Sequence, residues 1–269
     1  MHPELFSIQL GNFVWVVKAY SFFYFIAALV VALGTFWLAK KRGFKNGALL
    51  VFIFGVIVGG FVGARILHWF TNQNAYVLGE YNLFSLDMEG FAFSGGIIGA
   101  LLIGYLLCRK LKIDFWKLGD TSIVFLGVGI AIARVGCFLN GCCFGKSTKL
   151  PWGVNFPELS QAHQYQLSHG VGSFFGVAAV HPTQLYEALA ALIGSLMAVH
   201  FIRKKVSTGV AILLFGLWFS FFRLLNMRLR VMPSTFDAPE FFYPIFYVSV
   251  MIMCGGMIWI KLKNSGNFR

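Results

Sequence analysis

The chain has 269 residues, of which 58% are hydrophobic and only 12% are charged, and its mean hydropathy is +0.74. A soluble domain of this length could not hide so much apolar surface, so the composition excludes an ordinary soluble enzyme and predicts an integral membrane protein. The net charge of +12 is not accompanied by an aromatic-basic nucleic-acid motif. The charge therefore favours contact with anionic membrane lipid and argues against nucleic acid as a partner.

Seven apolar segments are long enough to be membrane spans, since a bilayer core about 30 Å thick needs roughly 20 apolar residues in a helix. In chain order they cover residues 19–39, 48–70, 90–108, 121–139, 182–202, 209–225 and 241–260. The sequence thus predicts an all-α, polytopic membrane protein with seven transmembrane helices. The first segment lacks a small-residue cleavage site and is expected to be retained. No repeat or linker interrupts the chain, so residues 1–269 are predicted to form a single integral membrane domain.

Lysine and arginine residues are distributed unevenly between the predicted loops. The loops after the first, third, fifth and seventh segments hold fourteen of them, and the alternate loops hold five. Cytoplasmic loops of membrane proteins carry the excess of positive charge. The pattern therefore predicts an external amino terminus and a cytoplasmic carboxyl terminus.

Three arginines lie at the ends of predicted spans, namely Arg65, Arg134 and Arg223. A guanidinium at membrane depth needs a partner or an aqueous cavity, which makes it a candidate functional group. A guanidinium group binds two phosphate oxygens at once. Arg134 and Arg223 are therefore predicted to bind a phosphate. The alternative is snorkelling or pairing with a carboxylate, and Arg65 fits a lipid contact and an ion pair equally well. Glu187 is expected to be a structural counter-ion of Arg134 or Arg223.

Five cysteines are present, and three of them are close together in the sequence: Cys137, Cys142 and Cys143. This group lies at the predicted external side, where disulfides can persist. Three interpretations are open: a disulfide from Cys137 to one of the others, a metal site completed by His181, or simple packing. The spacing matches no zinc template, so no metal and no cofactor are predicted. The other two cysteines lie within spans and are expected to be buried apolar residues.

Four blocks of sequence occur in order: GVIVGGFVGARI, FAFSGGIIGALL, ARVGCFLNGCCFGKST with PWGVNFP, and HPTQLYEAL. Together they resemble the prolipoprotein diacylglyceryl transferases of bacterial inner membranes, over nearly the whole chain from Tyr20 to about Arg230. The resemblance implies a multi-pass inner-membrane enzyme whose active site faces the periplasm. Its implied substrates are phosphatidylglycerol and prolipoproteins. The implied reaction moves the diacylglyceryl group to a lipobox cysteine thiol and releases glycerol phosphate.

The resemblance also implies roles for individual residues. Arg134 matches the essential arginine of the family and Arg223 its second critical arginine, so both are expected to be catalytic. His181 is the only histidine within a family block and is a candidate base. The alternative is a hydrogen-bonded histidine at the end of a span that orients the loop. The expected substrate-binding residues are Tyr20, Arg65, Ser94, Gly95, Gly96, Asn140 and Gly145.

The residues themselves leave several of these roles open. Gly95 and Gly96 repeat small residues at helical spacing, which first indicates close helix packing in lipid. Asn140 suits donation to a phosphate and capping of a helix equally well. Ser94 is a poor base by itself, and it fits either a contact with water or the headgroup glycerol, or packing beside the glycines.

The sequence departs from the family pattern at four positions. Ser94 replaces a histidine found in many members, Cys137 and Cys142 replace an asparagine and a glutamate, and Met227 replaces an acid. These changes motivate an alternative function. The chain would then be a divergent member without this activity, namely a lipid-binding or maturation partner, or a transferase for another acceptor.

Overall fold

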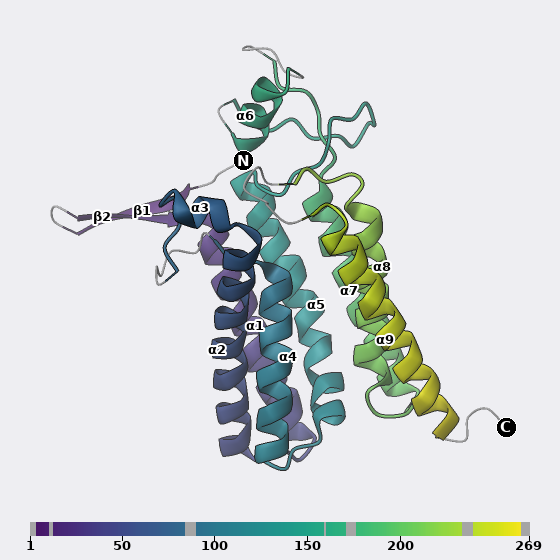
Figure 1. Ribbon diagram of the computed structural model, residues 1–269. Helices are drawn as coiled ribbons and strands as arrows, with labels where there is room; N and C mark the ends of the chain where they lie inside the picture. The colour runs from purple at the N-terminus through teal and green to yellow at the C-terminus, as the bar shows by residue number, and fades with distance from the viewer. Residues whose placement is uncertain are drawn as a thin grey trace.

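The computed structural model describes residues 4–10, 13–83, 90–158, 160–170, 176–232 and 239–264. Within these ranges a long helix covers each of the seven predicted segments (Figure 1): α1 (Ala19–Lys41), α2 (Asn46–Thr71), α4 (Phe93–Lys110), α5 (Phe115–Asn140), α7 (Thr183–Arg203), α8 (Val210–Asn226) and α9 (Phe242–Asn264). Five of them, α1, α2, α5, α7 and α9, are long and apolar enough to cross a membrane, and α8 is a shorter apolar helix. The prediction of a helical, multi-pass membrane protein is confirmed.

A small antiparallel hairpin precedes α1 and is absent from the all-α prediction. Its strands are β1 (Glu4–Leu10) and β2 (Phe13–Lys18), and β2 runs directly into α1. The second strand is rich in β-branched and aromatic residues, which favour extended backbone. The prediction did not include this hairpin because a search for runs of about 20 apolar residues does not detect strands of this length. Two short helices, α3 (Gln73–Val77) and α6 (Gln161–Ser168), complete the described elements.

The α5 helix lies between two groups of helices, with α1, α2 and α4 on one side and α7, α8 and α9 on the other (Figure 1). It packs along α1 and α7, while α2 packs along α4 and α8 packs against both α7 and α9. Glycines allow this central position: Gly129 faces Val31 of α1, and Gly127 lies against the Ala191 carbonyl of α7. Small residues let helix backbones approach closely in lipid. The ends of α5 and α8 lie at the same end of the bundle as the beginnings of α7 and α9 (Figure 1).

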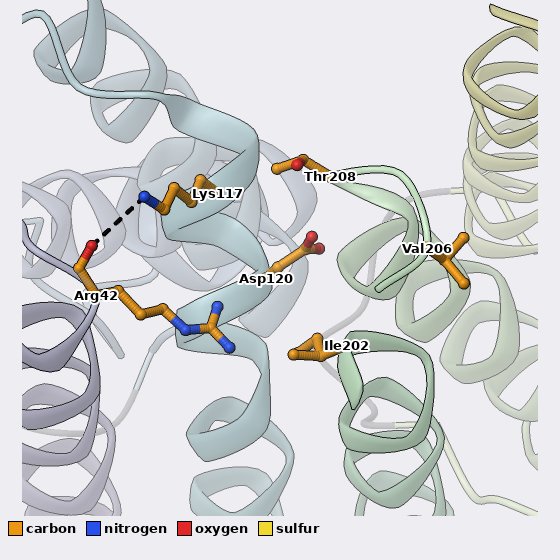
Figure 2. A pocket seen from close by; sticks show the side chains of 6 residues that line it. All are labelled: Arg42, Lys117, Asp120, Ile202, Val206 and Thr208. Atoms are coloured by element: carbon orange, nitrogen blue, oxygen red, sulfur yellow. Dashed lines mark hydrogen bonds between the residues drawn. The ribbon is translucent and has the colours of Figure 1, made fainter. Parts of the chain in front are cut away.

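The opposite end of the bundle, where α5 and α8 begin, holds an open cavity of about 410 Å³. Figure 2 shows its lining side chains, Arg42, Lys117, Asp120, Ile202, Val206 and Thr208. The buried Asp120 carboxylate accepts hydrogen bonds from the backbone N–H groups of Gly209 at 2.6 Å and Ile212 at 3.0 Å. These are N–H groups at the start of α8 that have no partner within that helix. Asp120 therefore acts as a cap that α5 supplies to a neighbouring helix.

We expect Asp120→Ala to lower the free energy of unfolding by roughly 3 kcal/mol, because two buried N–H groups lose a charged acceptor. Asp114→Ala is the matched control, since the exposed Asp114 carboxylate caps α5 through the N–H groups of Trp116 and Lys117. Loss of that exposed cap is expected to lower the same free energy by only about 1 kcal/mol. Unfolding of the detergent-solubilised variants measures both values. Equal losses would contradict the capping role of Asp120.

Candidate active site

A buried carboxylate binds three arginines where α5 and α8 end and α7 begins. Glu187 lies in the second turn of α7, and its side chain is only 1% exposed. Its Oε2 atom is 2.7 Å from Nε of Arg134, and its Oε1 atom contacts Nη1 of Arg223. Nη1 of Arg230, beyond the end of α8, is 3.5 Å from Oε1. We call these four residues the arginine cluster. The prediction that Glu187 is a counter-ion is confirmed, and the carboxylate serves both predicted arginines at once.

Two neutral residues hold the arginine cluster in place. The Asn226 amide donates to Oε1 of Glu187 at 2.9 Å. Nε and Nη2 of Arg223 donate to the Tyr247 hydroxyl of α9 at 3.1 and 3.0 Å. Sequence reasoning missed Asn226, Tyr247 and Arg230. The signal for Asn226 was present, because it follows Arg223 by three residues and so shares its helical face. Arg230 lies beyond the end of α8, so helical spacing could not have identified it.

The arginine cluster has a net positive charge. Among the described residues, three guanidinium groups face one carboxylate, which gives these four residues a formal charge of two positive units. The side chains of Arg134, Arg223 and Arg230 are only 6%, 12% and 14% exposed. Buried charge without full compensation is unfavourable. The cluster therefore suits an anion of about two negative charges, supplied from the partly exposed side of Arg223 and Arg230.

Tyr20 reaches the arginine cluster through two intermediate side chains. Its ring centroid lies 4.4 Å from that of Tyr24, one turn further along α1. The Tyr24 hydroxyl is 3.6 Å from Sγ of Cys137, and Nη1 of Arg134 donates to the same sulfur at 3.8 Å. The predicted residue Tyr20 is thus connected to Arg134, and Tyr24, which sequence reasoning missed, makes the nearer contact.

Three cysteines lie together at the end of α5: Cys137 is in its last turn, and Cys142 and Cys143 are in the loop that follows. The Sγ atoms of Cys137, Cys142 and Cys143 all lie within 4.8 Å of one another. We call these residues the thiol cluster. All five cysteines of the chain are free thiols in the structure, so of the three interpretations the disulfide is not observed. The sequence predicted no metal site because the spacing of the cysteines matches no zinc template. That spacing did not show that the three sulfur atoms lie close together.

The thiol cluster has a distinct electrostatic character. Hydrogen bonds from the Cys137 and Cys142 thiols hold the pKa of the Cys143 thiol well below its ordinary value, and the Arg230 and Arg134 guanidinium groups act in the same direction. A thiolate is the form of cysteine that acts as a nucleophile or metal ligand. Of the three thiols, Cys143 is therefore the one whose thiolate form the surroundings favour most.

Asn140 lies between Cys137 and Cys142 in the sequence, and Gly145 follows Cys143 by two residues. Asn140 is the last residue of α5, and Gly141 forms the C-cap with a left-handed φ of 72°. The Gly145 N–H donates to the His181 carbonyl at 3.0 Å, and a Cβ atom at Gly145 would lie 2.6 Å from Cβ of His181. Gly145 also forms a bridge with Arg230. A glycine is required at position 145 because three chain segments approach one another closely there. This close approach also brings Arg230 to the site.

His181 is part of a hydrogen-bonded row outside the arginine cluster. Its Nδ1 atom is 3.3 Å from the Tyr186 hydroxyl, and that hydroxyl accepts a hydrogen bond of 2.8 Å from Nε1 of Trp152. The His181 N–H donates to the Lys146 carbonyl at 3.0 Å. The residue is half-buried and precedes the first turn of α7. Both its backbone and its imidazole are therefore held in position.

The α4 helix contributes Ser94, which is buried in the first turn. Its hydroxyl has no hydrogen-bond partner among the described residues, and it lies near the phenol of Tyr243 in α9. The Tyr243 ring stacks on Tyr247 with a centroid separation of 6.1 Å, and Tyr247 binds Arg223. The structure thus connects Ser94 to the arginine cluster through two aromatic rings.

Gly95 and Gly96 face the α2 helix. A Cβ atom at Gly95 would collide with the Gly63 carbonyl oxygen and would lie 2.5 Å from Cβ of Leu67. A Cβ atom at Gly96 would lie 3.5 Å from Cβ of Ala64, which is an ordinary contact. Close helix packing, the first expectation for both glycines, therefore holds strictly at Gly95 only.

We expect Gly95→Ala to lower the free energy of unfolding by about 1–3 kcal/mol, because the backbones of α2 and α4 must separate. Gly96→Ala is the matched control and is expected to change it by less than about 0.5 kcal/mol. Thermal unfolding and lipid binding of both variants test this. A loss of lipid binding in a stable Gly96→Ala protein would instead assign a direct binding role to this segment.

Arg65 lies in α2 and contacts the segment before α4. The buried guanidinium donates from Nη1 to the Gly90 carbonyl at 3.1 Å and lies 4.2 Å from the centroid of Phe91. Hydrogen bonding and cation–π contact with the segment before α4 satisfy part of its charge. In these contacts Arg65 ties α2 to the start of α4.

Comparison with known proteins decides the family. The family model for prolipoprotein diacylglyceryl transferase matches residues 4–261, which include every residue of the candidate site. The chain belongs to the prolipoprotein diacylglyceryl transferase family. The resemblance expected from the four sequence blocks is confirmed.

Three relatives carry the name phosphatidylglycerol–prolipoprotein diacylglyceryl transferase. The protein of Geobacter sulfurreducens is 32% identical over 228 residues, which cover 83% of this chain and 80% of the relative. That of Wolbachia pipientis is 28% identical over 278 residues, covering 97% and 91%. That of Clostridium tetani is 29% identical over 175 residues and covers 64% of each chain.

Proposed function

We propose that this protein transfers a diacylglyceryl group from phosphatidylglycerol to the lipobox cysteine thiol of a prolipoprotein. The observation that carries the proposal is the arginine cluster, which holds two net positive charges inside a membrane protein of this family. Three named relatives that match most of the chain support the same substrates. The reaction makes a thioether, and the arginine cluster is proposed as the site where the phosphate of the lipid binds.

The proposed step is a displacement at the glycerol carbon that bears the phosphate. The thiol proton of the acceptor passes to a base, and the sulfur forms a C–S bond as the C–O bond to phosphate breaks. Glycerol phosphate leaves with the electron pair of that bond. The phosphate begins with one negative charge and departs with about two, so the interaction with Arg134 and Arg223 grows as the reaction proceeds. Interactions that strengthen in the transition state are those that raise the rate.

Further residues are proposed to bind the lipid around this phosphate. Tyr20 and Ser94 each reach the arginine cluster through neighbouring aromatic rings, on the α1 and α4 sides. Asn140 ends the helix that carries Arg134 and is half-buried. We propose that these residues surround the headgroup together with Arg65, the adjacent glycines Gly95 and Gly96, and Gly145.

The proposed orientation follows from the uneven distribution of basic residues. With seven spans and fourteen of the lysine and arginine residues on the cytoplasmic side, the carboxyl terminus would be cytoplasmic and the amino terminus external. The arginine cluster would then face the periplasmic side of a bacterial inner membrane. Single cysteines introduced into one loop at a time test this arrangement. A polar cysteine-reactive reagent added to intact cells should label only those in external loops.

We propose His181 as the group that accepts the thiol proton. If Nδ1–H donates to the Tyr186 oxygen, which also accepts from Trp152, the Nε2 atom is left as a base. His181→Gln is then expected to lower the rate by about 10²–10⁴-fold while lipid binding persists. Steady-state kinetics and lipid binding measure the two effects. A variant that keeps most of the rate would assign His181 to orienting the loop.

The function itself is tested by mass spectrometry of a lipobox peptide incubated with the purified protein and phosphatidylglycerol. We expect the mass of a diacylglyceryl group on the cysteine and release of glycerol phosphate. A peptide with serine in place of the lipobox cysteine is the control and should remain unmodified. No adduct from protein that is folded and binds the lipid would instead favour a divergent, lipid-binding member of the family.

A further inference from the structure

The geometry of the thiol cluster resembles a set of metal ligands. The three Sγ atoms of Cys137, Cys142 and Cys143 lie within 4.8 Å of one another. A metal ion with metal–sulfur bonds of about 2.3 Å holds its sulfur ligands roughly 4 Å apart in trigonal or tetrahedral geometry. Small rotations of the side chains are therefore enough to bring all three sulfurs onto one ion.

The backbone around the cysteines is held in place by bonds to α7. The carbonyl of Cys142 accepts a hydrogen bond of 2.7 Å from the Gln184 amide, and that of Cys143 accepts one of 2.7 Å from the Thr183 hydroxyl. Cys143 has a φ of 63°, in the left-handed region that non-glycine residues rarely adopt. Such conformations persist where the surrounding structure enforces them, and they are common at ligand-binding sites. The convergence of the sulfurs is thus built into the turn.

The surrounding charge favours an anionic metal–thiolate centre. Nη1 of Arg134 is 3.8 Å from Sγ of Cys137, and the adjoining arginine cluster has a formal excess of two positive charges. Three thiolates with one Cu(I) ion carry two negative charges, whereas three thiolates with Zn(II) carry one. Both complexes are anionic, so the neighbouring guanidinium groups stabilise either of them.

The donor set also favours a soft ion of low coordination number. Among the described residues, the group that converges here consists of three cysteines, without a histidine or a carboxylate. Structural zinc sites almost always have four ligands, and thiolate ligands select Cu(I) among the soft ions. Cys137 is buried, while Cys142 and Cys143 are partly exposed and provide a path of entry. We infer that Cys137, Cys142 and Cys143 form a binding site for one Cu(I) ion.

Binding forms three Cu–S bonds, and each thiol that is still protonated releases its proton to solvent. The experiment uses the full-length protein, reduced, freed of reductant under anaerobic conditions and kept in detergent. Cu(I) alone is titrated against a chromogenic Cu(I) chelator, and Zn(II) alone is titrated in a separate arm. We expect one Cu(I) per chain and sulfur as its only neighbour in X-ray absorption. Cys142→Ser and Cys143→Ser are expected to lower the affinity by at least about 100-fold.

The matched control is the double variant Cys108→Ser with Cys254→Ser, which removes two buried cysteines of α4 and α9. It should keep the full affinity for Cu(I). A second readout needs no variant: Cu(I) should protect Cys142 and Cys143 of the native chain from maleimide, as measured by peptide mass spectrometry. Failure of the native protein to retain Cu(I) against the chelator would overturn the inference. So would equal loss of affinity in the control, or tighter binding of Zn(II) with a nitrogen or oxygen neighbour.

Discussion

Arg134→Ala is expected to lower the rate of diacylglyceryl transfer by roughly 10²–10³-fold, as the removal of one group that stabilises developing negative charge does in other enzymes. Arg134 lies 2.7 Å from Glu187 and contacts the thiol cluster through Cys137. Its removal leaves the arginine cluster with one net positive charge and opens a void beside the proposed phosphate. The effect should therefore fall on the chemical step as well as on lipid binding.

The rate is measured with the lipobox peptide and phosphatidylglycerol, alongside a lipid-binding measurement. Arg134→Lys keeps the charge but loses the planar group that binds two oxygens at once, so it should retain only part of the activity. Arg42→Ala is the matched control, because Arg42 donates to Thr121 at the opposite end of the bundle. Undiminished transfer by a folded Arg134→Ala protein would remove Arg134 from the proposed mechanism.

Glu187→Gln is expected to lower the free energy of unfolding by about 3–5 kcal/mol, because it leaves three buried guanidinium groups without their shared counter-ion. Glu187 is 1% exposed and contacts Arg134, Arg223 and Arg230. Glutamine keeps the shape and a hydrogen-bond acceptor for Asn226 but carries no charge. The loss should therefore report the electrostatic part of the interaction.

A second substitution tests this explanation. Arg230→Gln in the Glu187→Gln background removes one of the repelling charges and should recover part of the lost stability, although each change alone destabilises the protein. Glu80→Gln is the matched control, because Glu80 is exposed, and a surface change of this kind alters stability by less than about 0.5 kcal/mol. Unfolding measured in detergent compares five proteins: the native chain, the two single variants, the double variant and the control. If Glu187→Gln unfolds like Glu80→Gln, the carboxylate does not hold the arginine cluster together.

Helix positions were predictable from sequence because apolar length is a local property of the chain. The boundaries were less so: α5 begins at Phe115 rather than at residue 121, and α9 continues past Lys261 to Asn264. A hydropathy pattern stops at the first charged residues, whereas a helix continues to its cap, which is Asp114 for α5. The hairpin before α1 was not predicted because its strands are much shorter than the apolar segments that identify membrane spans.

The sequence alone determined the membrane class, the positions of the long helices and the family, together with Arg134 and Arg223 as the central basic residues. Each of these depends on residue type and local spacing. Only the tertiary structure showed that Glu187 joins both arginines to Arg230, that Tyr247 binds Arg223, and that three cysteines converge. These contacts join residues far apart along the chain, and they exist because α5 packs against α7 and α8 against both α7 and α9. Side-chain convergence of this kind depends on helix packing and cannot be read from the order of residues.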